Sequence, residues 1–261
     1  MLALLLIAQL CPAQKLEAAR FPPGESLEFR LDALGADVGT FDVHVEAPPA
    51  SQRPRTALVL KARAKTNAFV STNVKRFDAL VTAQLGQSLL PLRYQEEIDE
   101  GEVHKGLEIE FPPRAGSLPV RASKNGEPEA LTLQAGEGVR DILSTLYLLR
   151  AQPLKEGAPV CVEVVAGRKI WRLTGAVGGR EIIETPLGKF STVRIDAVAV
   201  RADDGNVKRG AHVWVTDDAR RLPLVAIGDV RGKTIRAQLV QASGGGPALR
   251  MAQDGQRKLG R

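Results

Sequence analysis

The feature that most constrains the fold of this chain is the alternation of apolar and polar residues, interrupted at short intervals by turn sequences. It is clearest in residues 179–240, where the segments 184–190, 203–206 and 216–223 are rich in Pro, Gly, Asn and Asp. Alternation with a period of two is typical of strands with one buried face. Because such turn residues close hairpins, this half of the chain is predicted to form an antiparallel sheet.

The first half follows the same pattern. Residues 27–32 and 41–46 alternate around Gly35 and Gly39 and are predicted to form a hairpin. Further strands are predicted at residues 58–65, 77–85, 92–98, 103–111, 118–123, 130–134, 160–165, 169–177, 181–184, 192–200, 208–216, 222–227 and 234–240. At 261 residues, the chain lies within the size range of single all-β domains.

One helix interrupts the strands, and we expect it to span residues 138–151 and to end before Pro153. Its apolar residues recur every three or four positions and form one stripe: Val139, Ile142, Leu143, Leu146 and Leu149. The predicted fold is therefore mainly β: a single antiparallel, strongly curved sheet or open β-barrel, with one amphipathic helix covering it.

The N-terminus has the character of a signal peptide, predicted at residues 1–13. An apolar run over residues 1–10 precedes Cys11 and Ala13, small residues that suit cleavage after Ala13. The run is too short to span a bilayer, so no transmembrane span is expected in the mature chain. The rest divides into a linker (14–23), the antiparallel β domain (24–241) and a flexible basic tail (242–261).

These features predict a periplasmic protein. Cleavage after Ala13 would leave Cys161 as the single cysteine, so no intramolecular disulfide is expected, and Cys161 is interpreted as a small apolar strand residue. An outer-membrane lipoprotein is disfavoured because Leu10 stands before Cys11, where a small residue is required.

Common catalytic and cofactor motifs are missing from the sequence. Residues 228–234 resemble a phosphate-binding loop, but they have three residues between the glycines instead of four and precede a predicted strand. Residues 136–141 lack the third glycine of a dinucleotide-binding turn. The histidines His44, His104 and His212 are scattered. No catalytic residue, cofactor or metal site is therefore predicted.

The net charge of +6 comes from basic residues dispersed among 30 acidic ones. No basic run interleaved with aromatic residues marks a nucleic-acid surface, so no nucleic-acid partner is expected.

Four segments carry a family resemblance: residues 23–29, 141–150, 184–190 and 213–223. Together and in this order, they are similar to those of exported Gram-negative proteins that share domain of unknown function 3108, and the likeness extends from Phe21 to Val240. The resemblance implies a β-rich envelope protein, and it implies no activity and no catalytic residue.

Three functions remain open. The first is a non-enzymatic binding or carrier module for lipid or another apolar or amphipathic ligand, with Tyr94, Trp171 and Trp214 as candidate ligand-binding residues. The second is an assembly or scaffold protein that contacts other envelope proteins through a sheet edge or the helix. The third is a polysaccharide-acting hydrolase or lyase with two carboxylates brought together from distant strands.

Overall fold

The computed structural model describes residues 11, 16–17, 21–53, 55–230 and 232–251. Apart from Cys11, the expected signal peptide lies outside this part, as do the last ten residues of the expected tail. The strands are β1 (Ser26–Ala33), β2 (Ala36–Glu46), β3 (Leu58–Thr66), β4 (Phe77–Leu85), β5 (Pro91–Glu100), β6 (Val103–Glu110), β7 (Gly116–Lys124), β8 (Glu127–Ala135), β9 (Pro159–Ala166), β10 (Lys169–Thr185), β11 (Gly188–Arg201), β12 (Asp204–Thr216), β13 (Pro223–Val230), β14 (Lys233–Ser243) and β15 (Leu249–Arg250).

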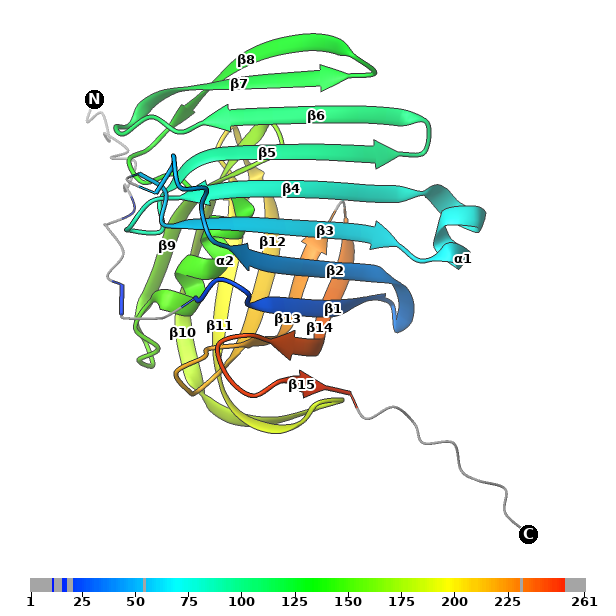
Figure 1. Cartoon of the computed structure of the whole chain (residues 1–261), viewed down its shortest axis with the longest axis vertical. Coiled ribbons are helices and arrows are strands. Elements are labelled where there is room, and N and C mark those ends of the chain that lie inside the picture. The colour runs from blue at the N-terminus through cyan, green and yellow to red at the C-terminus, as the bar shows by residue number, and fades with distance from the viewer. Residues whose placement is uncertain (1–10, 12–15, 18–20, 54, 231, 252–261) are drawn as a thin grey trace, which may run out of the picture.

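These strands form one antiparallel sheet of 15 strands, in the order β8-β7-β6-β5-β4-β3-β2-β1-β14-β13-β12-β11-β10-β9, with β15 on β14. Most strands pair with their neighbours in sequence, and the pairing of β1 with β14 joins the two halves of the chain. In Figure 1, the half made of β1–β8 lies in front of the half made of β9–β14, and the helix α2 lies between them. The predicted fold class, a mainly β, strongly curved antiparallel sheet, is confirmed.

Helix α2 spans Ile142–Ala151 and therefore begins four residues later than predicted. Gly138 has a positive φ of 74°, and Arg140 pairs with β9 in an extended conformation, so the preceding residues cannot be helical. Asp141 then caps the helix, because its side chain accepts a hydrogen bond from Ser144 N at 2.8 Å and its own N–H donates to the Ser144 hydroxyl at 3.0 Å.

The burial of α2 differs from the single predicted stripe. Ile142 is 51% exposed, whereas Tyr147 and Leu148 are fully buried. Leu143 and Tyr147 join a core cluster that also contains residues of β1–β7, and Leu148 joins a second cluster with residues of β9–β12. The helix thus packs against both halves of the sheet, and most of its circumference is buried.

Three further elements differ from the sequence-based expectation. The strands predicted at 169–177 and 181–184 are one strand, β10, with a bulge between Val177 and Arg180. A short helical segment, α1 (Ala68–Val70) followed by the π-helical turn η1 (Ser71–Lys75), connects β3 to β4. Strand pairing also continues past residue 241, through the end of β14 and the short strand β15.

Candidate functional site

The two end strands of the sheet, β8 and β9, are not paired with each other in the described structure; we call the line between them the seam. The connection from β8 to α2 partly closes it. The N–H of Arg140 donates to the carbonyl of Glu163 at 2.9 Å, and the N–H of Val165 donates to the carbonyl of Arg140 at 2.7 Å. The backbone before α2 therefore lies against β9 where a neighbouring strand would otherwise pair.

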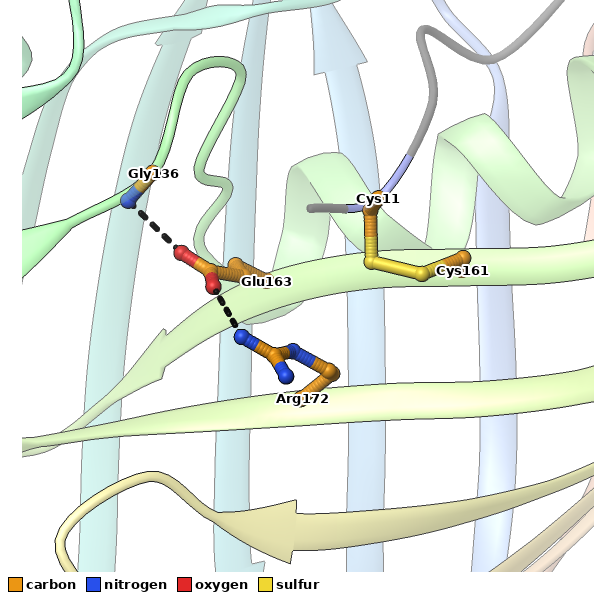
Figure 2. The surroundings of a disulfide bond; sticks show 5 residues. All are labelled: Cys11, Gly136, Cys161, Glu163 and Arg172. Atoms are coloured by element: carbon orange, nitrogen blue, oxygen red, sulfur yellow. Dashed lines mark hydrogen bonds and ion pairs between the residues drawn. A yellow bond between two sulfur atoms is a disulfide. The ribbon is translucent and has the colours of Figure 1, made fainter. Parts of the chain in front are cut away.

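Side chains also bridge the seam. Glu163 on β9 accepts a hydrogen bond from Gly136 N at 2.6 Å and one from Arg172 Nη2 at 3.1 Å (Figure 2). A Cβ atom at Gly136 would lie 2.6 Å from the Glu163 carboxylate, so a larger residue at this position would displace that carboxylate. Further along the seam, Arg168 donates to Glu129 at 2.8 Å. The carboxylates of Glu163 and Glu129 thus connect the β9 end of the sheet to the β8 end.

A pocket of about 680 Å³ opens beside the seam; we call it the seam pocket. Its lining comes from the N-terminal segment, the β4–β5 turn, the start of β5, the β6–β7 loop, the β8–α2 connection and β9: Cys11, Leu16, Gly86, Ser88, Leu90, Pro91, Leu92, Phe111, Pro112, Pro113, Gly136, Glu137, Gly138, Val139, Arg140, Cys161, Val162 and Glu163. Most of these residues are apolar, and the volume lies within the range of small-molecule sites.

One buried cation lines the seam pocket. Arg140 is 6% exposed, and its Nη1 donates to the carbonyl of Leu89. Burial lowers the pKa of Arg140 to about 10, against the opposing effect of the neighbouring Asp141 carboxyl. The guanidinium therefore stays protonated at neutral pH.

Cys11 and Cys161, both on the pocket wall, form a disulfide with a Cα–Cα distance of 5.1 Å (Figure 2). This corrects the expectation that Cys161 is an unpaired apolar strand residue. The fold brings together two cysteines that are 150 residues apart in sequence. Cleavage after Ala13 would separate Cys11 from the mature chain, so the disulfide belongs to the uncleaved chain.

The three aromatic residues chosen from the sequence are placed elsewhere, and they do not line the seam pocket. Tyr94 lies in the first core cluster, with its hydroxyl donating to Glu96 at 2.8 Å. Trp171 is buried, with the guanidinium of Arg209 4.5 Å from its ring centroid. Trp214 is partly exposed, and its indole N–H donates to Glu181 at 2.7 Å. Ligand binding by these residues stays a prediction.

A buried polar cluster joins three parts of the chain. Arg150 on α2 forms a bidentate ion pair with Glu25, which also accepts a hydrogen bond from the Tyr147 hydroxyl at 3.0 Å. Arg150 Nε donates to the carbonyl of Arg221 at 3.0 Å, in the loop between β12 and β13. These residues belong to three of the four segments that carry the family resemblance, so the fold brings those segments together around one buried cluster.

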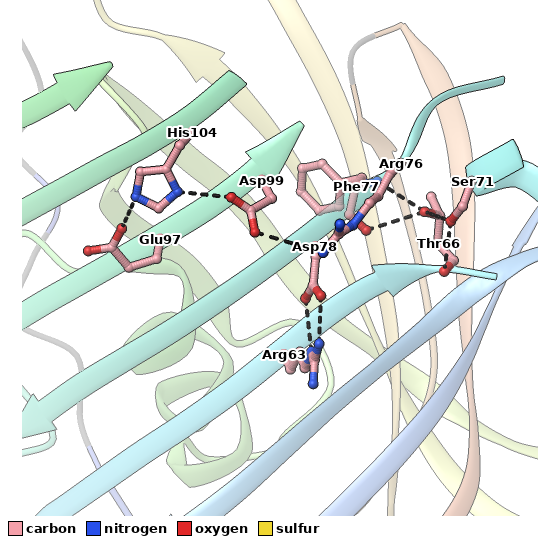
Figure 3. A network of polar contacts seen from close by, with 9 residues as sticks. All are labelled: Arg63, Thr66, Ser71, Arg76, Phe77, Asp78, Glu97, Asp99 and His104. Carbon is pink, nitrogen blue, oxygen red and sulfur yellow. Dashed lines mark hydrogen bonds and ion pairs between the residues drawn. The ribbon is translucent and has the colours of Figure 1, made fainter. Parts of the chain in front are cut away.

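Charged residues form a second, exposed network on the sheet, along β3–β6 (Figure 3). Arg63 pairs with Asp78 at 2.6 Å, and His104 lies 2.9 Å from both Glu97 and Asp99. In the described part of the chain, no group of three or more His, Cys, Asp or Glu side chains could hold a metal ion. All of these side chains except Asp78 are 44–59% exposed, so the network forms a solvated charged surface.

The fold and the pocket define a class: a barrel-like antiparallel β protein with an apolar cavity at its seam. The chain belongs to the family of proteins of unknown function DUF3108, whose sequence model matches residues 28–238. No curated protein matches the chain.

Two solved structures match the chain, and the first of them shares its fold. A β-barrel-like protein of domain of unknown function DUF1849 from Brucella abortus has a TM-score of 0.57 at 11% identity, with 87% of this chain and 99% of that chain covered. A Bacteroides fragilis protein with a YmcC-like fold has a TM-score of 0.37 at 8% identity, with coverages of 89% and 100%. Within the described residues, no helix is long and apolar enough to cross a membrane.

Proposed function

We propose that this protein is a periplasmic binding or carrier module for an apolar or amphipathic ligand, exported by the signal peptide expected at residues 1–13. The observation that carries the proposal is the seam pocket, a largely apolar cavity of about 680 Å³ in the uncleaved chain, all of whose lining residues except Cys11 remain after cleavage at Ala13. A cavity of this kind is a binding site for small molecules with substantial apolar surface. The seam supports the proposal further. The few hydrogen bonds that bridge it can separate more readily than a continuous strand ladder, and their separation would give a ligand access to the pocket.

Native mass spectrometry of the protein purified from the cell envelope tests the proposal. We expect a bound small molecule, and we expect the variant Leu90→Trp to lose it because the larger side chain fills the pocket. Val198→Trp is the matched control, since Val198 is exposed on β11 and does not line the pocket. A ligand-free wild type that also binds no amphiphile in solution would overturn the carrier proposal.

A second candidate function, an assembly or scaffold role, has one observation in its favour. Phe69 and Val74, in the segment formed by α1 and η1, are 72% and 75% exposed. Large exposed apolar side chains can mark protein contacts. Helix α2 is mostly buried and exposes one large apolar side chain, Ile142. A photo-crosslinking residue at position 69 should capture one defined envelope protein, whereas the same residue at exposed position 208 should not; equal labelling would argue against this role.

A further inference from the structure

Arg140 is the unusual member of the seam pocket because it is a buried cation that forms no ion pair with a described carboxylate. It is 6% exposed, and the Leu89 carbonyl accepts one of its hydrogen bonds. A guanidinium has five N–H donors, so one carbonyl satisfies a minor part of its capacity. Among the described residues, no carboxylate forms an ion pair with Arg140, and its one electrostatic neighbour is Asp141.

The described acidic side chains around the pocket offset this charge only in part, through the electrostatic effect of Asp141. Glu163 is held by Arg172 and by the N–H of Gly136. Glu137 lies on the exposed rim.

Asp141, the nearest in sequence, has no exposed surface, and its Oδ1 accepts a hydrogen bond from Ser144 N. Burial raises the pKa of the Asp141 carboxyl, and the hydrogen bonds around Ser144 partly oppose this shift. One oxygen of this carboxylate caps α2, and the carboxylate acts on Arg140 electrostatically without forming an ion pair with it.

A buried guanidinium gains most from a planar or tetrahedral oxyanion, which accepts two of its N–H groups at once. Such a partner would also offset the cost of removing the cation from water. Most of the rest of the wall, including Leu90, Phe111 and Val162, is apolar. The pocket thus combines one cationic point with a surface that suits a hydrocarbon chain.

We propose that the occupant of the seam pocket is an anionic amphiphile, whose carboxylate or phosphate head pairs with Arg140 while its apolar chain lies against Leu90, Phe111 and Val162. This inference rests on the proposed carrier function and narrows its ligand class.

Equilibrium binding to the purified full-length protein, below the micellar concentration of each probe, tests the inference. The probes are dodecanoate, dodecyl phosphate, 1-dodecanol and inorganic phosphate. We expect both anionic amphiphiles to bind about tenfold or more tightly than dodecanol, as a charge-assisted hydrogen bond implies. Inorganic phosphate has no hydrocarbon chain, so we expect it to compete only weakly with the two anionic amphiphiles for the pocket.

Variants assign the preference to Arg140. Arg140→Met should reduce the affinity for the anionic probes to that for dodecanol and leave dodecanol binding unchanged, whereas Arg140→Lys should keep part of the preference because it keeps the charge. Arg236→Gln, an exposed arginine on β14, is the matched control and should behave as the wild type. Urea midpoints of each variant verify that the protein stays folded.

The outcomes separate this inference from the carrier function. Equal affinity of the wild type for dodecanoate and dodecanol would overturn the role of Arg140 and leave the carrier function standing. Competition by inorganic phosphate as strong as that by dodecyl phosphate would make the pocket a simple anion site and overturn the amphiphile. Binding of none of the four probes would overturn both proposals.

Discussion

The carboxylate of Glu25 and the guanidinium of Arg150 form a bidentate ion pair inside the protein, with Nη1–Oε1 and Nη2–Oε2 distances of 2.7 and 2.8 Å. Their side chains are 3% and 0% exposed. Burial alone would lower the pKa of Arg150, but Glu25 and Tyr147 outweigh it, so this pKa lies above its ordinary value. The pair fixes α2 to the N-terminal end of β1, between the two halves of the sheet.

Removing one partner of this pair should destabilise the protein strongly. We expect Glu25→Gln to lower the free energy of unfolding by about 3–5 kcal/mol, because it leaves the Arg150 charge buried without its counter-ion. Asp78→Asn breaks the more exposed pair with Arg63 and should cost about 1 kcal/mol or less. Urea denaturation measures both. Similar losses of unfolding free energy in the two variants would contradict a larger contribution from the buried pair of Glu25 and Arg150.

The two faces of α2 predict a second contrast. Leu148→Ala should cost about 2–5 kcal/mol, because it leaves a cavity between the helix and β9–β12. Ile142→Ala, on the same helix at an exposed position, should change stability by about 0.5 kcal/mol or less. Thermal and urea midpoints compare the variants. Equal midpoints for Leu148→Ala and the wild type would contradict the position of the helix between the sheet halves.

Local sequence signals predict the strands of this fold well because most pairings are hairpins. The turn at Asn125 and Gly126, for example, joins β7 to β8, where strands are predicted at residues 118–123 and 130–134. The pairing of β1 with β14 has no such signal, since residues such as Ser26 and Ser243 meet only after the whole sheet has curved. The predicted start of the helix failed for the same reason: Arg140 is extended because β9 lies beside it.

The seam pocket could not be predicted from the sequence. Tyr94, Trp171 and Trp214 were chosen for their size, but large aromatic side chains in strands pack into the core or over their own sheet. The wall of the pocket comes from turns and connections that are far apart in sequence, and their meeting depends on where the sheet ends. The sequence places residues 136–140 in an incomplete nucleotide-binding motif and at the start of the predicted helix, and the two glycines and the arginine there are the available signal of the pocket.

The exposed network of Figure 3 predicts a pH effect centred on His104. The hydrogen bond to Asp99, with help from Glu97, raises the pKa of His104. Because the pKa of His104 is higher in the folded state than in the unfolded state, where it is about 6.5, its protonation stabilises the folded protein. This stabilisation is fully present at pH values below the unfolded pKa and is lost as the pH rises through the folded pKa. The stability difference between the wild type and His104→Gln should therefore be larger at pH 5 than at pH 8.5.

A direct measurement of the His104 titration completes this test. We expect NMR to show a lower His104 pKa in Asp99→Asn than in the wild type, because the main hydrogen bond to the imidazolium is weakened. Asp42→Asn, beside His44 on β2, is the control and should leave the titration of His104 unchanged. An unaltered midpoint in Asp99→Asn would contradict the contact with Asp99.

The disulfide and the expected signal peptide make opposite predictions about Cys161. If export is followed by cleavage after Ala13, Cys11 is lost, and we expect one thiol per mature chain to react with maleimide after denaturation without reductant. The uncleaved chain should have none, because Cys11 and Cys161 are bonded. Intact mass spectrometry of both forms, with Cys161→Ser as the unreactive control for the cleaved chain, measures cleavage and labelling together. Exported protein that retains Cys11 and shows no reactive thiol would contradict cleavage after Ala13 and would place the disulfide in the mature wall of the seam pocket.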